Sequence, residues 1–161
     1  MKSYKIFTSL LLITCISGCA LFKNKTIFNT GMVYPTRTTY EKSAERIVEK
    51  ARVLLENGEY LEAQRFLEKA LIIDPKNPYS YFFLGVLMQK KENFEMSLGH
   101  FEKCLSLLPH HSFWLGQTHK HLGIGFYRIG NKNKAVFHFE RSLQYDSRLK
   151  ESKTYLEELE R

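Results

Sequence analysis

Histidine is the residue type whose clustering in this chain first suggests chemistry. Five of the six histidines fall close together in the sequence, namely His100, His110, His111, His119 and His121. Neutral imidazole is a common ligand of zinc and copper, so a metal site has to be considered. Two histidines on one helix chelate a metal best four residues apart, whereas His119 and His121 are two apart and face different sides. No carboxylate or thiol is spaced to complete a set, and we therefore expect no metal site.

The three cysteines offer thiol chemistry only where a base activates them. Catalysis needs a nucleophile beside a base, a phosphate-binding glycine loop or paired carboxylates, and the sequence shows none of these arrangements. Gly123 and Gly125 follow no predicted strand, so they do not form a nucleotide loop. Cys104 falls in a column of small residues, described below, and is expected to be a buried structural thiol. We expect no enzymatic activity and no cofactor.

The N-terminus has the three parts of a targeting segment. A basic start with Lys2 and Lys5 precedes an apolar stretch over residues 6–16, which is too short for a permanent membrane span. The tetrapeptide Ile16-Ser17-Gly18-Cys19 then resembles the lipobox of bacterial lipoproteins. This resemblance implies a signal peptide over residues 1–18 and lipidation of Cys19, with fatty acyl chains such as palmitate. Ala20 is not the aspartate that favours retention in the inner membrane, so we expect an anchor in the periplasmic face of the outer membrane.

The residues after Cys19 indicate a flexible tether. Residues 19–38 lack helical periodicity and contain Gly31 and Pro35, and a flexible segment of this length has a root-mean-square span of roughly 20 to 25 Å. Residues 1–43 carry +5 of the net charge of +7, and +2 remains on the rest of the chain. Acids and bases are interspersed there, as on an ordinary solvated surface. We therefore expect no nucleic-acid partner.

Small residues recur at a regular spacing in the remaining sequence. A first set of four is followed by a second set about 34 residues later, and by a third after a slightly longer interval. The three sets are Ala51, Ala63, Ala70 and Pro75, then Gly85, Ser97, Cys104 and Pro109, then Gly123, Ala135, Ser142 and Ser147. Large apolar residues keep the same spacing in the columns Leu54, Met88 and Phe126, Leu67, Phe101 and Phe139, and Leu71, Leu105 and Leu143. This pattern predicts two amphipathic helices per repeat, in contact through their small residues.

The period and these columns resemble the tetratricopeptide repeat (TPR) family. The resemblance rests on stretches such as Lys69-Ala70-Leu71-Ile72-Ile73-Asp74-Pro75, Phe83-Leu84-Gly85 and Leu122-Gly123. It implies an all-α fold, a short α-solenoid of three helix-turn-helix repeats over about residues 44–77, 78–111 and 116–149, with a capping helix over 148–161. Together they form a TPR domain over residues 39–161. The third repeat departs from the pattern, because four extra residues enter near Ser112 to Leu115, and Lys132 and Ser147 replace an aromatic residue and a proline.

Periodicity and capping signals predict seven helices. Their expected ranges are 39–57, 60–73, 79–91, 94–107, 113–129, 134–145 and 148–160. Thr38 followed by Glu41 fits a capping box, and Gly58 and Gly130 are expected to end helices.

In the TPR family the first helix of each repeat lines a concave groove. The corresponding residues here are Val48, Arg52, Leu55, Tyr79, Phe82, Val86, Gln89, Lys120, Ile124 and Tyr127. Family members that grip a C-terminal carboxylate carry Lys and Asn where this chain has Val48 and Arg52, so that clamp is not matched. The resemblance implies binding of an extended or helical segment of another protein, and we expect Phe82 and Tyr127 to be aromatic anchors.

The expected function is that of a membrane-anchored adaptor or assembly factor in the bacterial envelope, which binds a protein or peptide partner. Two alternatives remain open. One is a metal-binding envelope protein that uses His110, His111, His119 and His121, and the other is a passive, self-associating scaffold.

Overall fold

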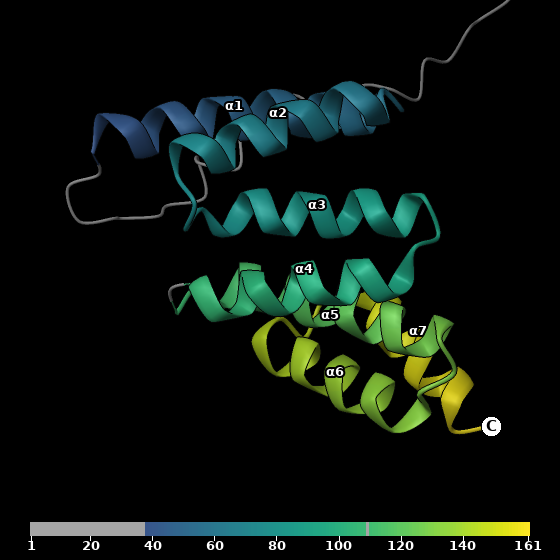
Figure 1. Ribbon diagram of the computed structural model, residues 1–161. Helices are drawn as coiled ribbons and strands as arrows, with labels where there is room; N and C mark the ends of the chain where they lie inside the picture. Colours follow the sequence, from purple (N-terminus) through teal and green to yellow (C-terminus); the bar gives the residue numbers. More distant parts are fainter. Residues whose placement is uncertain (1–37, 109) are drawn as a thin grey trace, which may run out of the picture. The chain divides into compact units, whose positions relative to one another are not determined.

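The described part of the chain consists of helices stacked in pairs. The computed structural model describes residues 38–108 and 110–161, and these contain seven α-helices and no strand. The helices are α1 (Thr39–Glu56), α2 (Tyr60–Ile73), α3 (Pro78–Lys90), α4 (Phe94–Leu107), α5 (Ser112–Arg128), α6 (Lys132–Tyr145) and α7 (Lys150–Leu159) (Figure 1). The predicted all-α fold of paired helices is confirmed. The proposed signal peptide (1–18) and all but the last residue of the proposed tether (19–38) lie outside the described residues.

Side-chain caps account for several helix ends. Thr38 and Glu41 form the predicted capping box, in which each side chain accepts from the other residue's backbone N–H. α6 begins at Lys132, two residues earlier than expected, because Asn131 is the N-cap and accepts from the N–H of Lys134. α7 begins at Lys150 instead of residue 148, because Arg148 is held in the preceding turn by the carboxylate of Asp146.

Within each repeat, the small-residue columns lie between the two helices. Seven members of the first three columns have no exposed surface, namely Ala51, Ala63, Ala70, Ser97, Cys104, Ala135 and Ser142. The remaining two, Gly85 and Gly123, are buried against the rings of Phe101 and Phe139. The approach is so close that an added Cβ would lie 2.7 Å and 2.6 Å from ring atoms. The predicted register of the repeats is therefore that of the structure.

A further column connects one repeat to the next. Ser80 on α3, Thr118 on α5 and Ser152 on α7 occupy equivalent positions, and all three are fully buried. Thr118 contacts Cys104 of the preceding repeat at 3.7 Å, and Ser152 accepts a hydrogen bond of 2.7 Å from Ser142. α7 thus packs on the third repeat as α5 packs on the second. The equivalent residue of α1 is Arg46, which is exposed, so the outward face of the first repeat is polar at this position.

The four extra residues before the third repeat lengthen one helix. α5 has 17 residues whereas α3 has 13, and the additional turn carries Trp114. Trp114 is 3% exposed and packs edge-on against Tyr79 and Phe82, with ring centroids 5.0 and 5.1 Å away. The insertion therefore adds to the core between α3 and α5.

Candidate functional site

The ten residues expected to line the groove divide into a buried and a partly exposed group. Four are buried, namely Val48, Leu55, Tyr79 and Phe82. Six are half-buried, namely Arg52, Val86, Gln89, Lys120, Ile124 and Tyr127. Only the second group presents surface to a partner, so the surface available for binding is narrower than the repeat positions alone indicate.

Phe82 lies in an aromatic cluster formed by rings of neighbouring helices in this chain. Its ring contacts Phe101 of α4 and Trp114 and His121 of α5, at centroid distances of 5.6, 5.1 and 5.4 Å. A side chain that is 5% exposed and surrounded by rings contributes chiefly to packing. The expectation that Phe82 is an exposed aromatic anchor is thus corrected, because Trp114 of the extended α5 packs against it.

One set of equivalent positions on the candidate surface stays partly exposed in all three repeats. Arg52, Val86 and Ile124 are equivalent in the repeat and each is half-buried. Arg52 pairs with Glu49 at 2.8 Å and with Glu56, both on the same helix, so its guanidinium is held against α1. These contacts raise the pKa of Arg52, chiefly through its hydrogen bond with Glu49. We name Arg52, Val86 and Ile124 the open column.

Helix α7 contributes two acidic residues that engage Lys120 and Tyr127 of the candidate surface. Lys120 pairs with Glu151 at 3.1 Å, and the hydroxyl of Tyr127 donates to Glu158. Tyr127 also contacts the ring of Tyr155 at 5.0 Å. Lys120 and Tyr127 therefore already have partners from α7, which sequence reasoning treated only as a cap. The equivalence of Ser152 with Thr118 and Ser80 is the sequence signal that places α7 as the first helix of a further repeat.

Gln89 joins neighbouring repeats. Its amide donates to the carbonyl of His121 at 2.8 Å, and its amide oxygen lies 2.7 Å from Nδ1 of the same histidine. The ring of His121 also stacks on Phe101. Burial, with Lys120 and Lys90 nearby, lowers the pKa of His121 to about 3. His121 is therefore a neutral structural residue.

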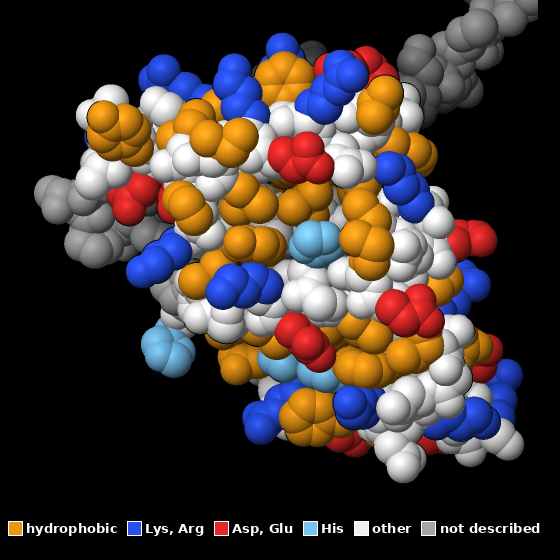
Figure 2. Space-filling view, viewed as in Figure 1, with side chains coloured by type: hydrophobic (Ala, Val, Ile, Leu, Met, Phe, Trp, Pro, Cys, Tyr) orange, Lys and Arg blue, Asp and Glu red, His pale blue; other side chains and the backbone are white. Residues whose placement is uncertain are grey.

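The histidines proposed for a metal site do not assemble as a group. His121 is engaged by Gln89, and His110 is exposed. Across residues 38–108 and 110–161, no set of three or more His, Cys, Asp or Glu side chains is placed to hold a metal ion. Figure 2 instead shows histidine side chains on one face among hydrophobic ones, flanked by charged residues.

The paired helices and their repeated register define a TPR-type helical solenoid. The family model described as "Tetratricopeptide repeat" matches residues 44–77, which include most of α1 and all of α2. Anaphase-promoting complex subunit 3 of Schizosaccharomyces pombe is 28% identical over 87 residues, a stretch that covers 53% of this chain and 12% of that protein. The chain thus spans about an eighth of this much longer relative.

Solved structures show the same fold at low sequence identity. The first TPR domain of Spaghetti (RPAP3), bound to the HSP90 peptide SRMEEVD, is 18% identical with a TM-score of 0.67, and the match covers 74% of this chain and 92% of that one. The N-terminal domain of stress-induced protein-1 from C. elegans is also 18% identical, with a TM-score of 0.65 and coverage of 78% and 100%. YrrB, described as a TPR protein with an unusual peptide-binding site, is 20% identical with a TM-score of 0.60 and coverage of 71% and 61%.

Proposed function

We propose that this protein is a lipid-anchored interaction module of the bacterial envelope, which binds a segment of another protein along the open column and catalyses nothing. The observation that carries the proposal is the open column itself. Arg52, Val86 and Ile124 come from the first helices of three successive repeats and stay partly exposed, while the neighbouring Val48 and Phe82 are closed off. A partly apolar stripe across several helices suits an extended or helical segment with apolar side chains.

Two cationic side chains, Arg52 in the open column and Lys120 one helical turn before Ile124, bear on how a partner associates. Arg52 is shared between two glutamates, and Lys120 is engaged by Glu151. Charged rim groups of this kind affect association rate and salt dependence more than affinity. Val48 stands where carboxylate-gripping relatives have a lysine, so the partner does not need a free C-terminus. The peptide seen on the Spaghetti TPR domain supports segment binding as the general mode.

Photo-crosslinking in cells tests the site. A photoreactive residue is placed at Val86 or Ile124, and a matched control is placed at Ile72, which is 81% exposed on α2. Defined crosslinked products from Val86 and Ile124 but not from Ile72 support the proposal. Crosslinks of equal yield from Ile72, or products from that site alone, overturn it.

The membrane anchor is tested separately. The helices in the described part of the chain all fall short of the length and apolarity that a membrane crossing needs. The proposed anchor is Cys19, and this proposal rests on the lipobox resemblance of residues 16–19. Cys19→Ser should abolish lipid labelling and release the protein from the membrane fraction, whereas unchanged membrane association contradicts this anchor.

A further inference from the structure

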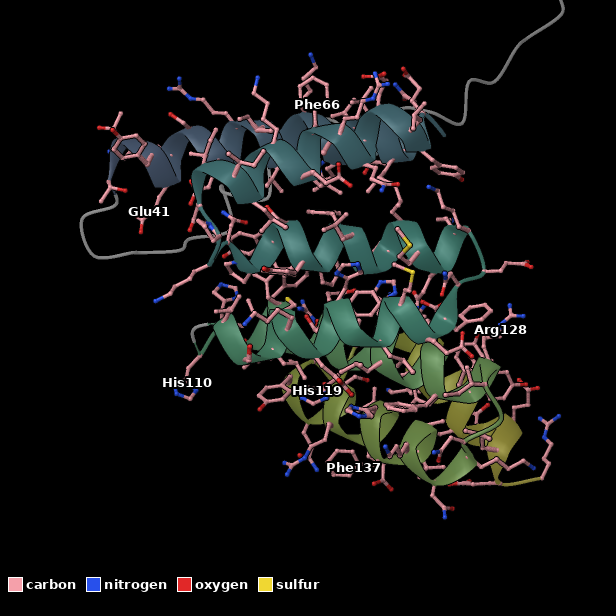
Figure 3. The ribbon with its side chains drawn as sticks, in the orientation of Figure 1. Glu41, Phe66, His110, His119, Arg128 and Phe137 are labelled. Atoms are coloured by element: carbon pink, nitrogen blue, oxygen red, sulfur yellow. The ribbon has the colours of Figure 1, made fainter. Side chains whose placement is uncertain are left out.

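Two histidines from neighbouring helices face each other where α5 packs on α6. Nδ1 of His119 and Nδ1 of His138 are 2.9 Å apart. Both residues are half-buried, and His119 can be followed in Figure 3 beside the ribbon of α6. His138 is the sixth histidine, which lies outside the cluster apparent in the sequence.

Flat aromatic contacts hold both imidazoles in place. His119 stacks on Tyr145 at 5.6 Å with an interplanar angle of 12°, and His138 stacks on Phe126 at 5.3 Å with an angle of 10°. Rings held this way keep their nitrogen atoms in a fixed place, which reduces the entropy lost when a ligand binds.

Both imidazoles are in the protonation state that binds metals. Burial lowers the pKa of each to about 4, with Arg141 adding to the effect on His119, and His119 and Lys134 adding to that on His138. At neutral pH one Nδ1 therefore carries the shared hydrogen and donates it to the other. When that hydrogen moves to Nε2 of its own ring, both Nδ1 atoms offer a lone pair and no proton is lost.

The spacing fits two adjacent positions around one ion. Metal–nitrogen bonds of about 2.0 to 2.1 Å at a right angle place the two nitrogens roughly 2.9 Å apart. Square-planar and tetragonal geometry with right angles is typical of Cu(II), which also binds imidazole most strongly among the divalent ions of its row.

We propose that His119 and His138 form a two-imidazole site for a divalent transition-metal ion, preferentially Cu(II), that links α5 to α6. This chain supplies two ligands, and the remaining positions are filled by water. Arg141 and Lys134 weaken the site by repulsion, although each rests on an aromatic ring, Arg141 over Phe137 and Lys134 over Phe126. The inference is independent of the function proposed above.

The repeat supplies a matched control. His100 occupies in the second repeat the position that His138 has in the third, but it faces Tyr81, with ring centroids 6.4 Å apart, instead of a second imidazole. His100→Ala therefore removes a histidine from the same kind of surface without touching the pair.

Titration of the full chain with copper(II) chloride tests the proposal. Electron paramagnetic resonance reports nitrogen ligands, and circular dichroism checks the folding of each variant. We expect one site with nitrogen ligation in the wild type and in His100→Ala, and at least about tenfold weaker binding in His119→Gln and in His138→Gln.

A further variant keeps both ligands. Arg141→Gln should bind copper more tightly than the wild type because it removes a repelling charge. This test does not depend on whether His119→Gln and His138→Gln fold. Absence of a nitrogen-ligated site in the wild type overturns the proposal. Unchanged affinity in folded His119→Gln and His138→Gln, or in Arg141→Gln, also overturns it.

Discussion

The Cα of Gly85 lies against the ring of Phe101, with no space for a side chain between them. A Cβ on Gly85 would lie 2.7 Å from two ring atoms. The third repeat has the same arrangement in Gly123 and Phe139. The first repeat has Ala51 and Leu67 at these positions. The larger alanine in place of glycine on the first helix is thus accompanied by the smaller leucine in place of phenylalanine on the second helix. The first repeat fills this volume with an Ala–Leu pair, and the second and third repeats fill it with a Gly–Phe pair.

Gly85→Ala should therefore lower the free energy of unfolding by about 1 to 3 kcal/mol through overpacking. Adding Phe101→Leu recreates the pair of the first repeat and should recover part of the loss. Urea denaturation of the two single variants and the double variant measures the coupling between the sites. Strictly additive effects of the two changes would show that the ring does not set the limit at residue 85.

Glu92 occupies the left-handed turn position that glycine has in the other repeats. Its φ is 57°, compared with 81° at Gly58 and 79° at Gly130. A non-glycine residue is strained in this region, so Glu92→Gly should stabilise the protein by about 0.5 to 1 kcal/mol. Gly58→Ala should have the opposite effect, of about 1 kcal/mol. Thermal denaturation of both variants checks the prediction, which fails if Glu92→Gly is destabilising.

Acid should destabilise the fold through His121. Its pKa is about 3 in the folded protein and about 6.5 when unfolded, so the unfolded chain binds the extra proton between these values. Stability from this residue is complete above pH 6.5 and is lost as the pH falls. The expected loss from His121 alone between about pH 6.5 and about pH 5 is about 1 to 2 kcal/mol, and His119 and His138, whose pKa values are also lowered, add to the total loss. His121→Gln should be less stable at neutral pH but show a smaller pH dependence, which urea denaturation at several pH values measures.

Phe82 should matter for folding rather than directly for binding. Because its ring is buried among Phe101, Trp114 and His121, Phe82→Ala should cost about 3 to 5 kcal/mol of stability. Ile124 lies in the open column. Ile124→Asp should therefore abolish crosslinking to a partner from a photoreactive residue at position 86, and it should cost less stability than Phe82→Ala. Calorimetry of both variants distinguishes the roles, and a near wild-type melting temperature for Phe82→Ala would contradict its place in the core.

Cys104 should be an unreactive thiol in the folded protein. Burial raises its pKa to about 12, although the contact with Thr118 partly opposes this shift. Since the thiolate is the nucleophile, alkylation at mildly alkaline pH should be slow in the native state and fast in denaturant. The measurement uses Cys19→Ser, in which lipidation is absent, together with Cys15→Ser. Rapid native labelling at residue 104 would show that the α4–α5 contact opens readily.

The sequence by itself determined the local and repeated features of this protein. The helices, the capping box at Thr38 and the turn glycines follow from neighbouring residues, and the columns at Gly85 and Ala63 follow from a period that any stacked helix pair must obey. These features depend on short-range hydrogen bonds and on one packing geometry used three times.

The tertiary structure decided which of the expected groove residues are accessible. Burial of Phe82 depends on Trp114, which comes from an irregular insertion far along the chain, and no repeat pattern specifies where an added turn directs its side chains. The pairing of His119 with His138 likewise depends on the rotation of α5 against α6. Contacts between distant residues depend on how whole helices fit together, so the open column and the histidine pair emerge only from the packed fold.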